Sequence, residues 1–235
     1  GAFGSFSTGV GTTDMANILA TGDMWIKVPP TLVFELAGQL PSDISAKDIM
    51  LFILGQIGCQ GAMGKVMEFR GSIIESLSMD ERMTQRNIAV EFGALCGLIA
   101  PDAITQEYLK DRLHSEVSIV TGDAEAEYEH IYHFNLSNLE SQVACPPKPD
   151  QVKNISELDQ ITIDRAFIGS CTGGKLTDLA VAASVLRDRH VNPKVEMHVV
   201  PASQTVLSQA QKLGYIDIFE QAGVQILKSG CGACI

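Results

Sequence analysis

"ITIDRAFIGSCTGGKLTDLAVAASVLRDRHVNPKVEMHVVPAS", residues 161–203, changes its hydrophobic period twice and so decides the fold. Residues 161–171 have the pattern of a strand, residues 175–190 place apolar side chains at helical spacing, and residues 194–203 return to a strand. Two strands joined by a helix need a crossover connection, which makes them parallel strands of one sheet. This stretch therefore predicts a βαβ unit.

The same alternation continues to the end of the chain. A helix is expected over residues 204–214, and a third strand begins at Val224 and runs into the turn "SGCGACI", residues 229–235. The resulting βαβαβ layout is typical of a parallel sheet with crossover helices. The fold class we predict is therefore α/β.

The upstream half also alternates between helices and strands. We expect helices at 12–23, 45–58 and 79–102, and strands at 29–40 (with Pro29 and Pro30 outside it) and 64–71. Ser45 with Asp48, and Ser78 with Glu81, have the spacing of capping boxes. These pairs predict where the second and third helices begin.

Segment 111–157 is polar, broken and rich in proline near its end, so it indicates a crossing or a boundary. We therefore expect three parts: residues 1–29 as the tail of a preceding α/β domain, 30–152 as a second α/β domain, and 153–235 as a further α/β domain that is incomplete at its C-terminus. The first residues lack Met and have the pattern of a glycine-rich turn region, which suggests a truncated or processed chain.

Composition excludes several classes of protein. The chain has 235 residues, 46% of them hydrophobic, and 28 acidic against 17 basic residues, a formal charge of −11. This charge balance argues against nucleic acid as a partner, because phosphate binding needs a basic face. No apolar run reaches the roughly 18 residues of a membrane helix. Six scattered cysteines do not form a secreted disulfide framework, which favours a reducing compartment.

Three of the six cysteines are predicted to meet at one edge of the sheet. Cys171 follows the first strand of the βαβαβ unit, and Cys231 and Cys234 form a C-x-x-C after its last strand. In parallel α/β sheets, ligand sites lie beyond the carboxyl ends of the strands. Cys59, Cys96 and Cys145 are expected elsewhere as free thiols, the first two inside helical patterns.

Three thiolates on glycine-rich turns suit an iron–sulfur cluster better than zinc. Structural zinc is nearly always held by four protein ligands. His190 and His198 fall in a helix tail and a strand, so neither is expected to supply a fourth. A cluster with three cysteine ligands leaves one iron open, and an open iron can act as a Lewis acid on a substrate oxygen.

The motifs "GSCTGGKLTDLAVAA" and "SGCGACI" resemble the paired cluster signature of the aconitase superfamily. The upstream segments "GAFGSFSTGVGTTDMA", "KVPPTLVFELAGQLP" and "MEFRGSIIESLSMDERMTQRNIAVEFGA" agree with this. Within the superfamily, the chain is similar to the middle of the large subunits of the 3-isopropylmalate dehydratases. The resemblance runs over all 235 residues, and it implies an aconitase-like large-subunit core.

The resemblance implies a hydro-lyase with a [4Fe–4S] cluster held by Cys171, Cys231 and Cys234. Glu68 matches the family glutamate near the iron-bound water or hydroxyl, and Lys175 is a candidate contact for the substrate or the cluster edge. The implied reaction interconverts 2- and 3-isopropylmalate through 2-isopropylmaleate in leucine biosynthesis. The implied partners are a small subunit and a small dicarboxylate hydroxy acid, in the cytoplasm or, for a plant or alga, the plastid stroma.

Two features depart from the family pattern. Gly173, Gly174 and Lys175 stand where many members have Asn-Gly-Arg. The family's Asp-Ser-His-Thr motif should precede Gly1, the arginines that bind substrate carboxylates should follow Ile235, and the serine base belongs to the small subunit. This chain alone is therefore expected to be inactive.

Three other interpretations stay open. The cluster enzyme could act on homoaconitate, dimethylmalate or citrate-type acids. The chain could be a non-catalytic piece of a large subunit. It could also be a structural module that holds zinc or a disulfide.

Overall fold

The chain forms two compact units, Gly1–Glu157 and Leu158–Ile235, in a computed structural model that describes residues 1–113, 118–123 and 125–232. The first unit includes residues 1–29 and the polar stretch up to residue 157. The expected division into segments 1–29, 30–152 and 153–235 stays a prediction.

The first unit contains a four-stranded parallel sheet in the order β3-β2-β1-β4. Its strands are β1 (Thr31–Ala37), β2 (Val66–Arg70), β3 (Cys96–Ile99) and β4 (His130–Asn135). β1 begins directly after Pro29 and Pro30, because proline has no N–H to donate to a neighbouring strand. The parallel pairing confirms the predicted α/β class.

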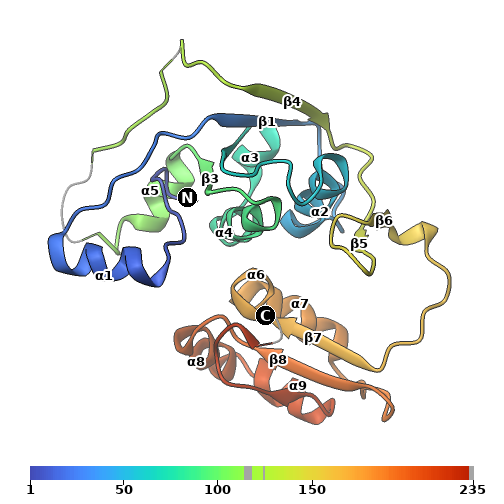
Figure 1. The fold of residues 1–235 in the computed structure, drawn as a ribbon. Coiled ribbons are helices and arrows are strands. Elements are labelled where there is room, and N and C mark those ends of the chain that lie inside the picture. Colours follow the sequence, from blue (N-terminus) through green and yellow to red (C-terminus); the bar gives the residue numbers. More distant parts are fainter. Residues whose placement is uncertain (114–117, 124, 233–235) are drawn as a thin grey trace. The chain divides into compact units, whose positions relative to one another are not determined.

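Helices α2 (Ala46–Ile57), α3 (Ser72–Ser76) and α4 (Met79–Ile88) pack on one face of this sheet (Figure 1). Side chains at alternate strand positions, such as Phe34 and Phe69, point into the core that these helices cover. Both predicted capping boxes are present, Ser45 with Asp48 and Ser78 with Glu81. The capping spacing in the sequence therefore located the starts of α2 and α4 correctly.

The prediction of one long helix over 79–102 was wrong. α4 ends at Ile88, a 3₁₀ turn η1 (Ala89–Phe92) follows, and Gly93 adopts a left-handed φ of 74° that stops the helix. The apolar residues after it pair with β2 as β3, which places Cys96 on a strand. A short apolar run fits the hydrophobic period of a helix or of a strand, and here its hydrogen bonding with β2 makes it a strand.

Helices α1 (Thr12–Thr21) and α5 (Ala103–Leu109) contribute no residue to the main core of the first unit. α1 lies within the helix expected at 12–23 and is capped by Gly22, and α5 follows β3. Segment 111–157, expected to be a crossing or a boundary, contains β4, an antiparallel pair β5 (Gln142–Ala144) and β6 (Val152–Asn154), and a 3₁₀ turn η2 (Ile155–Glu157). Cys59 lies in the turn after α2, so its predicted helical position was also wrong.

The second unit has a three-stranded parallel sheet in the order β7-β8-β9. Its elements are β7 (Arg165–Gly169), α6 (Ser170–Gly173), α7 (Leu176–Leu186), β8 (Glu196–Val200), α8 (Gln204–Lys212), α9 (Tyr215–Gln221) and β9 (Gln225–Ile226). The core contains Leu179, Val199 and Phe219, drawn from a helix, a strand and a second helix. This arrangement confirms the predicted βαβαβ order, with α6 and α9 as additions.

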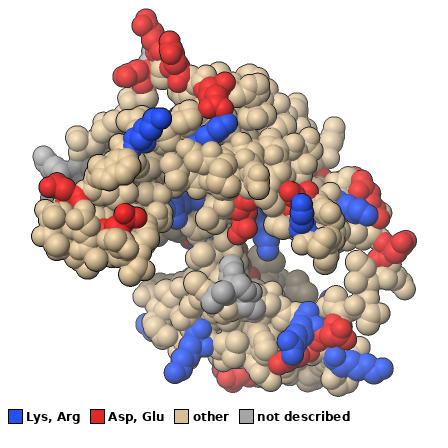
Figure 2. All heavy atoms as spheres, viewed as in Figure 1, with Lys and Arg blue, Asp and Glu red and all other residues tan. Residues whose placement is uncertain are grey.

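On the face drawn in Figure 2, the charged side chains of the described residues do not form one basic patch. Figure 2 shows the lysines and arginines of the visible face at separate places, interspersed with acidic residues. Within the described parts of the chain, no helix combines the length and apolar character needed to cross a membrane.

A buried arginine joins α4 to the start of α5. Arg82 is fully buried, and its guanidinium makes two hydrogen bonds to the Asp102 carboxylate, at 2.8 and 2.6 Å. It also donates to the carbonyls of Leu77 and Ile74, at 3.1 and 3.0 Å. The hydrogen bonds from Arg82, together with the Thr105 N–H, lower the pKa of Asp102 to about 2. A buried cation with this many partners holds the two helices in one arrangement.

We expect acid to weaken the first unit through this pair. The pKa of Asp102 is lower in the folded chain than its usual value of 3.8, so its contribution to stability is complete above that value. The contribution is lost as pH falls through the folded value of about 2. Urea unfolding midpoints measured between about pH 5 and 2 should fall less steeply in an Asp102→Asn variant than in the parent. Parallel pH curves would contradict this assignment.

Candidate metal centre

Cys171 lies on a strained one-turn helix at the carboxyl end of β7. Gly169 ends the strand with a φ of 154°, and Ser170 follows with a φ of 66°, a left-handed value that is rare outside glycine. Ser170 is buried and its hydroxyl lies 3.2 Å from the Thr172 hydroxyl, while Cys171 itself is exposed. Strain of this kind persists where the surroundings impose it, often at functional sites. The chain thus presents this thiol at the predicted sheet edge.

The end of β8 packs tightly against the Cys171 turn. A Cβ added at Gly174 would lie 2.4 Å from the carbonyl oxygen of Val200, and one at Gly169 would meet the same oxygen at 2.4 Å. The Ala202 N–H donates to the Gly174 carbonyl at 2.8 Å. Both glycines are therefore required so that two backbone segments can approach closely.

The two adjacent glycines of this turn should respond very differently to alanine. Gly174→Ala should cost about 1–3 kcal/mol, because its methyl group would overlap the backbone of Val200. Gly173→Ala meets nothing within 4 Å and should be neutral or stabilising by up to about 1 kcal/mol. Thermal and urea unfolding of the two variants measure this difference. Equal effects would mean that the close approach to β8 is absent in solution.

Lys175 is buried beside the Cys171 turn. Its ammonium lies 3.3 Å from the carbonyl oxygens of Cys171 and Thr172 and 3.6 Å from the Asp178 carboxylate. Asp178 also accepts the backbone N–H of Lys175 at 2.9 Å, which begins α7. Only about 7% of Lys175 is exposed, so the cation satisfies the carbonyl groups of the turn that carries the thiol.

Cys231 lies at the same edge of the second unit's sheet. The chain leaves β9 with the Leu227 N–H donating to the Val199 carbonyl, and Cys231 is exposed. A Cβ at Gly232 would lie 3.1 Å from the Phe167 ring and 3.1 Å from the Val200 side chain. The Cys231 segment thus packs on the end of β8, the same strand end that contacts the Cys171 turn. Cys234 lies outside the described residues.

The remaining cysteines lie in the first unit. Cys96 is buried, and Cys59 and Cys145 are partly buried. Burial and the neighbouring Asp150 raise the pKa of the Cys59 thiol. Among the residues that the structure describes, no three Cys, His, Asp or Glu side chains form a group that could hold a metal ion. The described part of the predicted centre is therefore the pair Cys171 and Cys231.

Glu68, the predicted catalytic carboxylate, lies on β2 in the first unit. Its side chain is on the sheet face opposite the helices, half-buried, between Val33 of β1 and Leu98 of β3. Burial raises the pKa of Glu68, and the nearby Arg70 partly offsets this. Arg70 is bonded to Glu35 at 3.2 Å. A carboxyl group with a raised pKa in a half-buried position can take up or release a proton closer to neutral pH.

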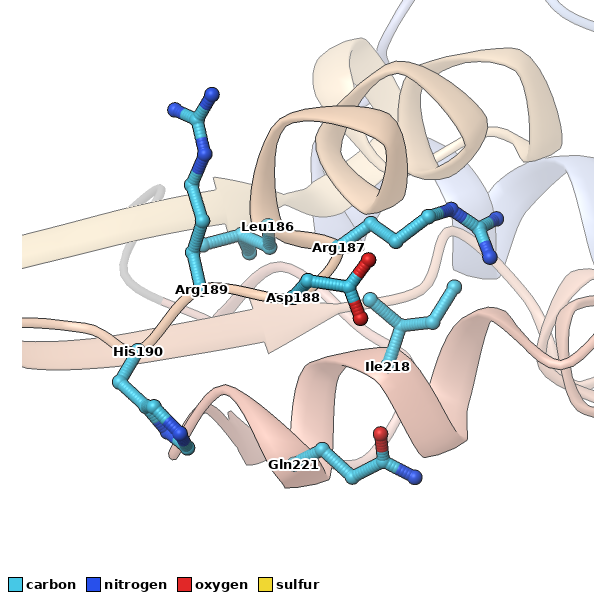
Figure 3. A pocket seen from close by; sticks show the side chains of 7 residues that line it. All are labelled: Leu186, Arg187, Asp188, Arg189, His190, Ile218 and Gln221. Atoms are coloured by element: carbon cyan, nitrogen blue, oxygen red, sulfur yellow. The ribbon is translucent and has the colours of Figure 1, made fainter.

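A hollow of about 510 Å³ in the second unit does not belong to this centre (Figure 3). It lies where α7 ends, whereas Cys171 lies just before α7 begins. The eleven residues of α7 separate its ends by about 16 Å at the rise of an α-helix. In Figure 3 the side chains of Arg187 and Arg189 point in different directions, so they do not converge on one ligand.

The sequence did not indicate every residue that shapes the centre. Ser170, Asp178 and Val200 were not singled out, because strain, side-chain pairing and strand contact appear only in three dimensions. Ser229, just before Cys231, has a buried hydroxyl oxygen without a hydrogen-bond partner. The hint available in the sequence was the position of these residues beside the cysteines and glycines of the two turns.

The match to a family model places the chain in a known class of proteins. The model of the aconitase family, described as aconitate hydratase, matches residues 1–160 and 152–235. The chain therefore belongs to the aconitase family.

Within this family, the chain is similar to several curated large subunits. The chain is 46% identical over 235 residues to a 3-isopropylmalate dehydratase large subunit of Halothermothrix orenii, covering 100% of this chain and 56% of the relative. It is 44% identical over 235 residues to the one of Hydrogenobaculum, covering 100% and 55%. It is 44% identical over 237 residues to large subunit 1 of Pyrococcus furiosus, covering 100% and 56%. The chain thus spans about half the length of the curated relatives it matches.

Among solved structures, the holo-form of aconitase X from Thermococcus kodakaraensis is similar at 15% identity and a TM-score of 0.45. The similarity covers 87% of this chain and 44% of that chain. A likeness this distant says nothing about the site.

Proposed function

We propose that this chain is part of the large subunit of an iron–sulfur hydro-lyase. The observation that carries the proposal is the second unit's pair of exposed thiols, Cys171 and Cys231, on turns that both pack against the end of β8. A parallel α/β sheet binds its ligands at this edge. Membership of the aconitase family supports the same function.

Cys171, Cys231 and Cys234 would hold a [4Fe–4S] cluster. Two of these donors fit it: exposed thiols on glycine-containing turns, with the Cys171 turn fixed by Gly169, Gly174 and Lys175. When bound, a cluster with only three cysteine ligands supplies a Lewis-acidic iron that can bind a substrate hydroxyl and carboxylate. The protein's part is to keep the thiols in position and oriented toward solvent.

Glu68 is proposed as the acid–base carboxylate. Its half-buried position on β2 and its raised pKa support proton transfer to or from a leaving hydroxyl or water. Arg70, two residues later on the same sheet face, limits the rise of that pKa. The balance between burial and Arg70 sets the proton affinity of Glu68.

Lys175 is proposed to serve the same centre. The sequence suggested a substrate contact, and its burial and its hydrogen bonds favour a positioning role, in which it orients the Cys171 turn. Lys175→Met should leave the carbonyl groups of Cys171 and Thr172 without this donor and lower iron affinity by about 10–100-fold. Lys175→Arg should restore part of the loss. A raised KM with unchanged iron content in both variants would instead support substrate contact.

The proposed reaction interconverts 2- and 3-isopropylmalate through 2-isopropylmaleate, a step of leucine biosynthesis, with a small subunit as partner. The names of the relatives, 3-isopropylmalate dehydratase large subunits, support this substrate and this partner. Related hydroxy acids, such as homoaconitate, dimethylmalate or citrate-type acids, would need the same chemistry at the cysteine turns. Each of these acids is therefore also offered as a substrate in the activity assay.

The proposed function predicts which mixtures are active. The chain is reconstituted anaerobically with iron and sulfide, and formation of the unsaturated acid is followed by absorbance. The assay is run with the chain alone, with a large subunit of the relatives' full length that contains residues 1–235, and with small subunit added. We expect iron binding in all three and turnover only in the last. Turnover by the chain alone, or a chain that binds no iron, would refute the proposal.

A further inference from the structure

A continuous segment near the start of the first unit is almost entirely exposed. This segment, residues 11–28, is called the apolar strap here and includes helix α1. Its large apolar side chains are all at least 43% exposed, apart from the partly buried Ile18: Met15, Leu19, Met24, Trp25, Ile26 and Val28. Leu19 is 80% exposed, and Trp25 and Val28 are each 85% exposed. Single exposed apolar residues are normal, but a cluster of six in eighteen positions marks an interaction surface.

The helix in this strap gains little from the unit that carries it. α1 has ten residues, none of them buried. An isolated helix of that length is marginal in water, because packing of an apolar face supplies most of a helix's stability. The side-chain hydrogen bonds of Thr21 stay within the strap, to the carbonyl groups of Asn17 and Asp23. The apolar face of α1 therefore has the chemistry of a helix that packs against something else.

The strap also has a shaped surface. A hollow of about 330 Å³ is lined by its residues Met24, Trp25 and Ile26 and by Leu95 from the segment before β3. Asp14, Asn17 and Lys27 also line it. An apolar depression with a tryptophan in its wall and polar groups around it resembles the pockets that receive anchor side chains at protein interfaces. In Figure 2 the surface over α1 is largely free of charged side chains, apart from some acidic ones.

We propose that the apolar strap is covered by the rest of the same polypeptide, the portion that large subunits carry beyond the region these 235 residues span. The relatives match every residue of this chain, strap included, yet this match accounts for only 55–56% of their length. In those relatives the remainder belongs to the same polypeptide and so is present at a high effective concentration, which a second copy or a separate partner lacks. The inference rests on the family membership and not on the proposed reaction.

Residue-resolved oxidation by hydroxyl radicals tests the strap directly, because tryptophan and methionine are reactive and Trp25 is the chain's only tryptophan. The 235-residue chain is compared with a longer chain in which residues 1–235 replace the matching region of the Halothermothrix orenii large subunit. Mass spectrometry should show severalfold slower oxidation of Trp25, Met15 and Met24 in the longer chain. Met63, 58% exposed at another place in the first unit, should keep its rate.

Every other pattern overturns the proposal. Protection in the short chain that grows with its concentration would mean that a second copy covers the strap. Protection of the longer chain only after small subunit is added would assign the strap to that partner. Equal oxidation of the strap residues in both chains would mean that the strap is uncovered in the longer chain. If Met63 were protected as strongly as the strap residues, the change would not be specific to the strap.

Two lysine variants give an independent readout. Leu19→Lys and Val28→Lys should lower the thermal unfolding midpoint of the longer chain, because a charge would be buried there. They should leave the 235-residue chain unchanged, since both positions are exposed in it. Val181→Lys, 66% exposed in the second unit, is the matched control and should change neither chain. A longer chain indifferent to Leu19→Lys and Val28→Lys would contradict the proposal.

Discussion

Replacing Cys171 with alanine is expected to abolish iron retention after anaerobic reconstitution. The thiol is exposed on a one-turn helix held by the end of β8 and by Lys175. It is one of only three proposed sulfur ligands, so its loss leaves two, which do not close a cluster site. Iron and sulfide content after gel filtration, together with the visible absorption of thiolate-bound iron, measure the effect.

Cys145→Ala is the matched control. Cys145 is a partly exposed thiol in the first unit, beside the turn that joins β5 and β6, and its loss should leave iron content unchanged. Cys171→Ser keeps nearly the same side-chain volume and should also lose iron. This result would show that iron is lost because the sulfur ligand is missing and not because packing has changed. Full iron retention by Cys171→Ala would remove this residue from the centre.

Asp102→Asn is expected to destabilise the first unit by about 3–5 kcal/mol, the cost of leaving a buried charge without its partner. Arg82 is fully buried, and Asp102 supplies the carboxylate that neutralises it. The asparagine keeps the shape of the side chain but removes its charge. Urea unfolding at neutral pH, followed by circular dichroism, measures the free energy of unfolding.

Glu35→Gln tests whether burial of the ion pair is the reason for the large loss of stability expected in Asp102→Asn. Glu35 pairs with Arg70 at 3.2 Å, but both side chains are 39% exposed. Exposed pairs contribute about 0–1 kcal/mol because water screens them. A loss as large in Glu35→Gln as in Asp102→Asn would mean that the Arg82 pair owes nothing to its burial.

The fold could be predicted where local signals agreed with tertiary structure. The Ser45 and Ser78 capping boxes located two helices, and the change of period around Cys171 located β7, α7 and β8. The prediction failed at β3, whose residues 96–99 fit a helix as well as a strand, and at β4, where the local sequence is polar. Both are edge strands that form because β1 and β2 offer them hydrogen-bonding partners.

For the candidate site, the sequence located the cysteine turns but not what holds them. The edge position of Cys171 and Cys231 followed from the order of strands and helices. The close approach of Gly169 and Gly174 to Val200 joins residues far apart in the sequence, so no local pattern contains it.

The order of strands in the two sheets also has a consequence for how the chain folds. In the first unit, β1 pairs with β4 so that Leu32 lies opposite His130, whereas in the second unit Phe167 lies opposite His198. Closing the longer loop costs more chain entropy before any contact repays it, and non-local pairing slows folding. During synthesis, β1 must also wait for β4 to emerge. Until then, the edge of β1 that β4 will occupy is open to incorrect pairing with another strand. Paired strands of the second unit lie closer together in the sequence than β1 and β4, so the wait is shorter, and we expect this unit to be the faster of the two to reach its native structure.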